Sequence, residues 1–112
     1  STIAAARQVD WLRQVVETCE RAATHRPFCI FGTSIVATWL ASELSAAPDL
    51  YLDEDPARIG HRLNGVPIAA PAEAPSGATV VLAIAPAVAA AVAVRLAPLG
   101  LNFVKTPAYS IG

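Results

Sequence analysis

The stretch Phe28-Cys29-Ile30-Phe31-Gly32-Thr33-Ser34-Ile35-Val36-Ala37 decides the fold expected for this chain. Four apolar residues run into Gly32, a Thr-Ser pair follows, and from Val36 onward apolar residues recur at helical spacing. This order predicts a buried strand over 28–31, a turn at Gly32 and a helix over 34–45. A strand that ends on glycine at the start of a helix leaves free backbone N–H groups, which favour an anion such as a phosphate.

Segments with strand and helix patterns alternate along the rest of the chain. An amphipathic helix is predicted over residues 2–24, and Asn64-Gly65 between short apolar stretches predicts a small hairpin. Further strands are predicted at 50–52, 79–84 and 101–104, with a helix over 86–96. The alternation predicts an α/β fold of three layers, with a mainly parallel sheet of about four to five strands.

The chain of 112 residues is long enough for one domain with a single core. Residues 1–26 are expected to form the leading helix that packs on the domain, residues 27–105 the domain itself, and residues 106–112 a tail. The chain begins with Ser and contains no Met, so it is expected to be an excised or processed piece of a longer protein.

Composition argues against several kinds of partner. The net charge of −1 does not indicate a basic surface that would bind nucleic acid or anionic lipid. The uncharged run 78–94 is interrupted by Pro86 and is shorter than the roughly 20 apolar residues that a membrane span needs. Cys19 and Cys29 have no CxxC or histidine neighbour, so they are expected to be buried thiols in a reducing cytoplasm rather than metal ligands.

The glycine turn is a degraded form of the dinucleotide-binding fingerprint. Gly32, Ser34 and Ala37 occupy the three positions of the G-x-G-x-x-G spacing. Gly32 can make the turn and Ala37 can allow close packing, but Ser34 adds a side chain where a pyrophosphate would approach. A single phosphate or a hydroxyl-bearing ligand is therefore favoured over a dinucleotide. The alternative is that Ser34 or Thr33 only caps the helix.

Asp53 is the second candidate binding residue. It lies 21 residues after Gly32 (53 − 32), close to the roughly 20 residues that separate a phosphate loop from a ribose-binding acid. Its carboxylate could accept hydrogen bonds from sugar hydroxyls. The alternative is an acidic turn, since Glu54 and Asp55 follow directly.

Other reactive residues form no self-sufficient catalytic constellation. His25 and His61 have no Cys or Asp partner at a useful spacing, and Ser34 lacks a nucleophile elbow. Trp11 could line a ligand site, with core or interdomain packing as the alternative. Arg58 and Arg62 could reach a phosphate, with a solvated loop as the alternative.

Three segments together resemble a known family: Phe31-Gly32-Thr33-Ser34, then Leu52-Asp53-Glu54-Asp55-Pro56-Ala57-Arg58-Ile59-Gly60, then Leu63-Asn64-Gly65-Val66-Pro67-Ile68. Their order is similar to that of Rossmann-like domains in nucleotide-sugar and methyl-transfer pathways. It resembles in particular the carboxy-terminal domain of bacterial sugar C-methyltransferases and related S-adenosylmethionine-dependent methyltransferases. A second relative is the amino-terminal domain of sugar O- and N-acyltransferases. The resemblance covers about Trp11 to Val104.

The resemblance implies a Rossmann-like tail domain whose methyl-donor site would belong to a separate, preceding domain. It carries the candidate site onto Gly32, Thr33, Ser34 and Asp53. The expected function is a non-catalytic module that recognises a nucleotide or nucleotide-sugar or positions a partner domain, with a homodimer as a further expectation. The alternatives are an NAD(P)-binding enzyme fragment and an oligomerisation scaffold with a vestigial nucleotide loop. No particular cofactor is indicated.

Overall fold

The computed structural model describes residues 2–107, apart from the side chains at positions 4, 7, 8 and 35. Most of the tail expected over 106–112 therefore lies outside the described residues. The elements follow in the order α1 (Thr2–Ala22), β1 (Phe28–Phe31), α2 (Ile35–Glu43), β2 (Leu50–Leu52), β3 (Arg62–Leu63), β4 (Val66–Ala69), β5 (Thr79–Leu82), α3 (Pro86–Arg95) and β6 (Asn102–Lys105). Short 3-10 turns occupy Pro71–Glu73 and Ala97–Leu99.

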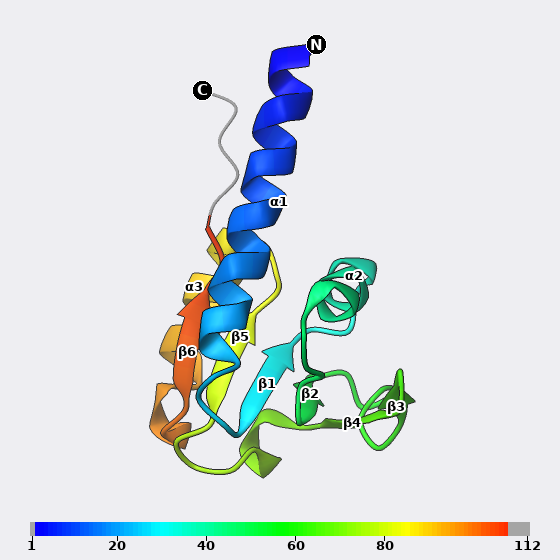
Figure 1. Cartoon of the computed structure of the whole chain (residues 1–112). Coiled ribbons are helices and arrows are strands. Elements are labelled where there is room, and N and C mark those ends of the chain that lie inside the picture. Colours follow the sequence, from blue (N-terminus) through cyan, green and yellow to red (C-terminus); the bar gives the residue numbers. More distant parts are fainter. Residues whose placement is uncertain (1, 108–112) are drawn as a thin grey trace.

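The chain is an α/β fold, with a six-stranded sheet and three α-helices among the described residues (Figure 1). The strand order is β3-β4-β2-β1-β5-β6, and every pair is parallel except β3 with β4. The order is compatible with a Rossmann-like layout, because β2 and β4 extend to one side of β1 while β5 and β6 extend to the other. The direction of winding therefore reverses between β1 and β5, and this is the topological switch point of the sheet.

The structure differs from the expectation of about four to five strands with a small hairpin in the number of strands. The hairpin forms as predicted, since Asn64 and Gly65 both have positive φ angles, of 51° and 79°. Its second strand, β4, also pairs in parallel with β2, so the hairpin extends the main sheet to six strands. The turn has a local sequence signal, whereas the pairing of β4 with β2 is a long-range contact without one.

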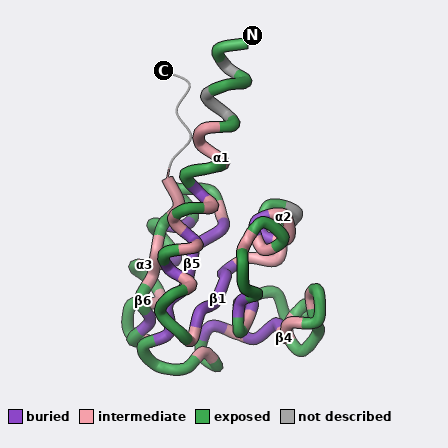
Figure 2. The backbone as a smooth tube through the Cα atoms, viewed as in Figure 1, coloured by how far each residue is buried: buried purple, intermediate pink, exposed green. Residues whose placement is uncertain are grey.

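Helices cover both faces of the sheet. Phe28 and Ile30 of β1 belong to a buried cluster with residues of α1 and α2, whereas Cys29 and Phe31 belong to a second cluster with α3. All four residues of β1 are buried, which explains the uninterrupted apolar run in the sequence (Figure 2). Cys19 and Cys29 are free and buried, as predicted.

The leading helix α1 is an integral part of the fold. The connection between β4 and β5 contains only a single 3-10 turn, so it supplies no crossover helix to cover β5. Helix α1 packs against β5 instead. Its amino-terminal part extends beyond the sheet (Figure 1), where Ile3 and Val9 are 68% and 66% exposed. None of the described helices is both long and apolar enough to cross a membrane.

Strand β5 ends at Leu82, two residues before the predicted end. The Ala83 N–H still donates to the Phe31 carbonyl oxygen at 3.1 Å, one residue beyond the end of the strand. Pro86 has no N–H group, and it restricts the backbone of the residue before it. Residues 83–85 therefore form a loop at the carboxyl edge of the sheet, directly beside the end of β1.

Candidate functional site

The turn after β1 needs a glycine. Gly32 has a φ angle of +110°, and its N–H donates to the Leu52 carbonyl oxygen at 2.8 Å. A Cβ atom at this position would lie 3.3 Å from both the Ala83 carbonyl oxygen and Cγ2 of Ile84. Both the backbone angle and the close approach to the end of β5 therefore exclude an ordinary side chain. The expected turn at Gly32 is confirmed.

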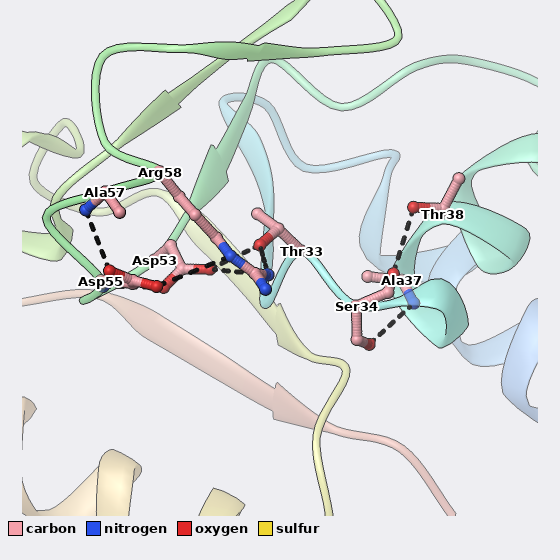
Figure 3. Close-up of polar contacts among 8 residues, drawn as sticks. All are labelled: Thr33, Ser34, Ala37, Thr38, Asp53, Asp55, Ala57 and Arg58. Atoms are coloured by element: carbon pink, nitrogen blue, oxygen red, sulfur yellow. Dashed lines mark hydrogen bonds and ion pairs between the residues drawn. The ribbon is translucent and has the colours of Figure 1, made fainter.

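Thr33 and Asp53 meet at the carboxyl ends of β1 and β2. The Thr33 hydroxyl donates to Oδ2 of Asp53 at 2.6 Å (Figure 3). The other oxygen, Oδ1, accepts the N–H of Asp55 at 2.8 Å. The Asp53 side chain is only 16% exposed. Two residues predicted to share a binding site therefore lie in direct contact.

Arg58 completes this cluster from the loop after β2. Its Nη1 donates to the Thr33 hydroxyl at 2.5 Å and lies 3.9 Å from Oδ2 of Asp53. Its Nε lies 3.7 Å from Oδ2 of Asp55. We call Thr33, Asp53, Asp55 and Arg58 the polar cluster. The Arg58 side chain is half exposed and therefore remains accessible to solvent.

The pKa of Asp53 lies below its ordinary value of 3.8. Partial burial alone would raise this pKa. The hydrogen bond from Thr33, the backbone N–H groups of Asp55 and Glu54, and the charge of Arg58 outweigh burial because each stabilises the ionised form. Asp53 is therefore a carboxylate at neutral pH and acts as a hydrogen-bond acceptor.

Ser34 faces a different direction from Thr33. It is the amino-terminal cap of α2, and its Oγ accepts the N–H of Ala37 at 3.4 Å. Figure 3 shows Thr33 directed toward Asp53 and Ser34 directed toward the first turn of α2. Ser34 therefore caps α2, which is the alternative role that the sequence allowed. Of the four predicted site residues, Gly32, Thr33 and Asp53 lie together, whereas Ser34 lies on the other side of the turn.

A cavity of about 620 Å³ opens on the Ser34 side of the turn. Helix α1, helix α2, the β5–α3 connection and the segment after β6 all contribute to its wall. Its main apolar lining residues are Trp11, Val15, Leu40, Ile84, Pro86 and Val88. None of the described lining residues carries a charge, and Ser34 and Thr106 supply side-chain hydroxyls. The volume is within the usual range of about 300–1,000 Å³ for small-molecule sites.

The wall of the cavity connects distant parts of the chain. The Trp11 indole Nε1 donates to the Pro107 carbonyl oxygen at 2.6 Å, which joins α1 to the segment after β6. Val36 and Val88 also line the cavity and remain 55% and 52% exposed, so its rim is apolar and open to solvent. An accessible apolar surface of this kind commonly marks a binding site.

The sequence left two interpretations open for Trp11 and two for Arg58, and the structure shows where each side chain lies. Core packing was the alternative for Trp11, which packs partly against the core and also lines the cavity. A solvated loop was the alternative for Arg58, which lies exposed on the loop after β2 and also donates to the Thr33 hydroxyl. Val36 and Val88 were not predicted to line a binding site. The sequence pattern that could have indicated them is an apolar residue in the first turn of each helix that begins at the carboxyl edge.

Other charged residues have structural partners or lie on the surface. Arg95 of α3 binds both carboxylate oxygens of Glu54, at 2.5 and 2.7 Å. His25 and His61 are both exposed. Among the described residues, no group of three or more His, Cys, Asp or Glu side chains could hold a metal ion.

No protein-family model, curated protein or solved structure matches the chain.

Proposed function

We propose that this chain is a non-catalytic, Rossmann-like module that binds a nucleotide or nucleotide-sugar at the carboxyl edge of its sheet. The observation that carries the proposal is the position of the cavity of about 620 Å³. It opens at the switch point between β1 and β5, beside the Gly32 turn. In open α/β sheets, ligands bind outside the carboxyl ends of the strands at this point.

The polar cluster adds the groups that a sugar or a phosphate requires. A carboxylate has about four acceptor positions, and the Thr33 hydroxyl and the backbone N–H groups of Asp55 and Glu54 use three of those on Asp53. The remaining position can accept a sugar hydroxyl. The half-exposed side chain of Arg58 can contact a phosphate oxygen.

The ionisation of Asp53 and of the two core thiols favours binding over catalysis. Asp53 has a lowered pKa and holds no proton at neutral pH, so it is a poor general acid, and its weak basicity makes it a poor general base. Burial, as the larger cause, raises the pKa of Cys19 to about 12 and that of Cys29 to about 11. Both thiols are consequently poor nucleophiles.

We also propose that the chain is one module of a larger protein. The module would be the tail of a methyltransferase-type protein, where it presents a nucleotide-sugar or packs against the preceding domain. The projection of α1 beyond the sheet, with Ile3 and Val9 exposed, supports a contact with another domain (Figures 1 and 2). This part of the proposal derives from the resemblance of the Gly32 and Asp53 segments.

Titration calorimetry tests the ligand half directly. The panel contains nucleotide-sugars, S-adenosylmethionine, NAD⁺ and NADP⁺. We expect at least one nucleotide-sugar to bind, and to bind more weakly to the Asp53→Asn variant. Glu43→Gln, an exposed change at the end of α2, is the matched control and should leave binding unchanged. A folded chain that binds no member of the panel would refute the proposal.

An oligomerisation scaffold is the second candidate, favoured by the exposed Ile3 and Val9 on the projecting part of α1. Sedimentation of the chain should then reveal a dimer that Val9→Lys dissociates. Val94→Lys is the matched control, since Val94 is 78% exposed on α3. A strict monomer at all concentrations would exclude this second candidate.

A further inference from the structure

The cavity and the polar cluster lie on opposite sides of one turn. Thr33 leads into the polar cluster, and the next residue, Ser34, lines the cavity. Figure 3 shows these two side chains diverging from the start of α2. A ligand that crosses the turn would therefore meet an uncharged, apolar surface at one end and a carboxylate and a guanidinium at the other.

The apolar side suits a flat, uncharged ring. Trp11 is the aromatic side chain among the described lining residues, and aliphatic groups from Ile84, Pro86 and Val88 complete the wall. Ring stacking against aromatic and aliphatic side chains is a common way for proteins to hold a nucleobase. The Ser34 hydroxyl accepts from Ala37 but can still donate to an acceptor on such a ring.

A phosphate is poorly suited to the same cavity. None of its described lining side chains is charged, so an anion that enters the cavity loses hydration and meets no side-chain cation there. The accessible cation of this edge is Arg58, on the other side of Gly32. Charge complementarity therefore assigns the two halves of a nucleotide to different sides of the turn.

We infer that the cavity binds the base of the nucleotide against Trp11, and that the sugar and phosphate cross the Gly32 turn toward Asp53 and Arg58. This inference rests on the proposed function and specifies its orientation. It also gives α1 a direct role, because the leading helix supplies the aromatic wall of the site. Base recognition would then depend on α1, and sugar recognition on the loop after β2.

The test separates the two halves of the ligand by calorimetry. The probes are adenosine and uridine, which carry a base without phosphate, and ribose 5-phosphate, which lacks a base. We expect at least one nucleoside to bind and to compete with the nucleotide-sugar. Val88→Asp should weaken nucleoside binding about tenfold or more, because it places a charge on the apolar wall. Val94→Asp, on the same helix but outside the cavity, is the matched control.

Trp11 provides an independent variant. Trp11→Phe retains a ring and should bind nucleosides within a few-fold of the original chain, whereas Trp11→Ala should bind about tenfold or more weakly. Circular dichroism identifies a variant that fails to fold. Because Val88 is exposed, the Val88→Asp result remains decisive even if Trp11→Ala is unfolded.

The outcomes distinguish this inference from the proposed function. Nucleotide-sugar binding that Asp53→Asn weakens and that Val88→Asp leaves unchanged would overturn the inference and retain the function. Nucleoside binding that falls equally in Val88→Asp and Val94→Asp would also overturn it. A folded chain that binds neither nucleotides nor nucleosides would overturn both.

Discussion

The Thr33 hydroxyl and Oδ2 of Asp53 lie 2.6 Å apart, although the two residues are 20 positions apart in the chain. This hydrogen bond joins the turn after β1 to the end of β2. It holds the carboxylate at the carboxyl edge of the sheet and stabilises its ionised form. The Asp53 carboxylate is therefore placed and charged before any ligand arrives.

Thr33→Val should destabilise the fold by about 1–2 kcal/mol, because it removes a hydrogen bond to a charged, mostly buried group. It should also raise the pKa of Asp53. A lowered pKa contributes stability that is present above the ordinary value of 3.8 and is lost as pH falls through the value in the folded chain. The difference between the two chains should therefore be full at neutral pH and should disappear in acid.

Urea unfolding across this pH range, with an NMR titration of Asp53, measures both effects. Thr38→Val is the control, because the Thr38 hydroxyl bonds only to the Ser34 carbonyl oxygen within α2 among the contacts described. That change should alter stability by no more than about 0.5 kcal/mol. An equal effect of the two substitutions would contradict the role given to the Thr33 hydroxyl.

Gly32→Ala should destabilise the fold more than Gly60→Ala. Both glycines have positive φ angles, so both substitutions cost about 1–3 kcal/mol in backbone strain. Only Gly32 would place the new Cβ 3.3 Å from the Ala83 carbonyl oxygen, whereas nothing lies within 4 Å at Gly60. We expect an additional loss of about 1–3 kcal/mol at Gly32 from crowding. Equal losses in thermal unfolding would show that the close approach to β5 is unimportant.

The sequence predicts the fold well where the signal is local. The strands at 28–31 and 50–52 have the predicted bounds, because each is a short apolar run next to a residue that breaks it. The Asn64-Gly65 turn is also confirmed, because its signal lies in the two turn residues themselves. The pairing of β4 with β2 was missed, since parallel pairing depends on distant residues and leaves no pattern at either strand.

One feature of the candidate site could likewise be predicted from the sequence, whereas the others could not. The proximity of Thr33 and Asp53 follows from the rule that parallel strands end at a common edge. The direction of Ser34 depends on the capping geometry of α2, and the place of Trp11 depends on where α1 docks. Neither can be derived from residue spacing. The cavity is formed by segments from both ends of the described chain, so sequence reasoning could not outline it.

Ser34→Gly tests the alternative of an NAD(P)-binding enzyme. The variant replaces a capping serine by glycine, which should cost only a few tenths of a kcal/mol. It removes the side chain that stands where a pyrophosphate would approach. An NAD(P) site should therefore gain measurable affinity in calorimetry, whereas the orientation proposed above predicts no gain. Tighter NAD(P) binding by the variant would favour the alternative.

Cys19 and Cys29 should resist alkylation in the folded chain. Burial chiefly raises their pKa values, to about 12 and about 11, and Glu20 and Asp49 add smaller increases. At pH 8, about 0.1% or less of either thiol is ionised, and both are fully buried. Iodoacetamide labelling followed by mass spectrometry should find both thiols unmodified in the folded chain. Unfolding in guanidinium chloride should make both thiols reactive. Rapid modification of the native chain would contradict their burial in the two core clusters.

Amide NMR during titration with a nucleotide-sugar tests whether a ligand binds at the switch point. We expect saturable shifts at Gly32, Ser34, Ile84 and Val88, with Val94 unaffected as an internal reference. Shifts confined to the exposed residues of α1, or a spectrum unchanged at millimolar nucleotide-sugar, would contradict it.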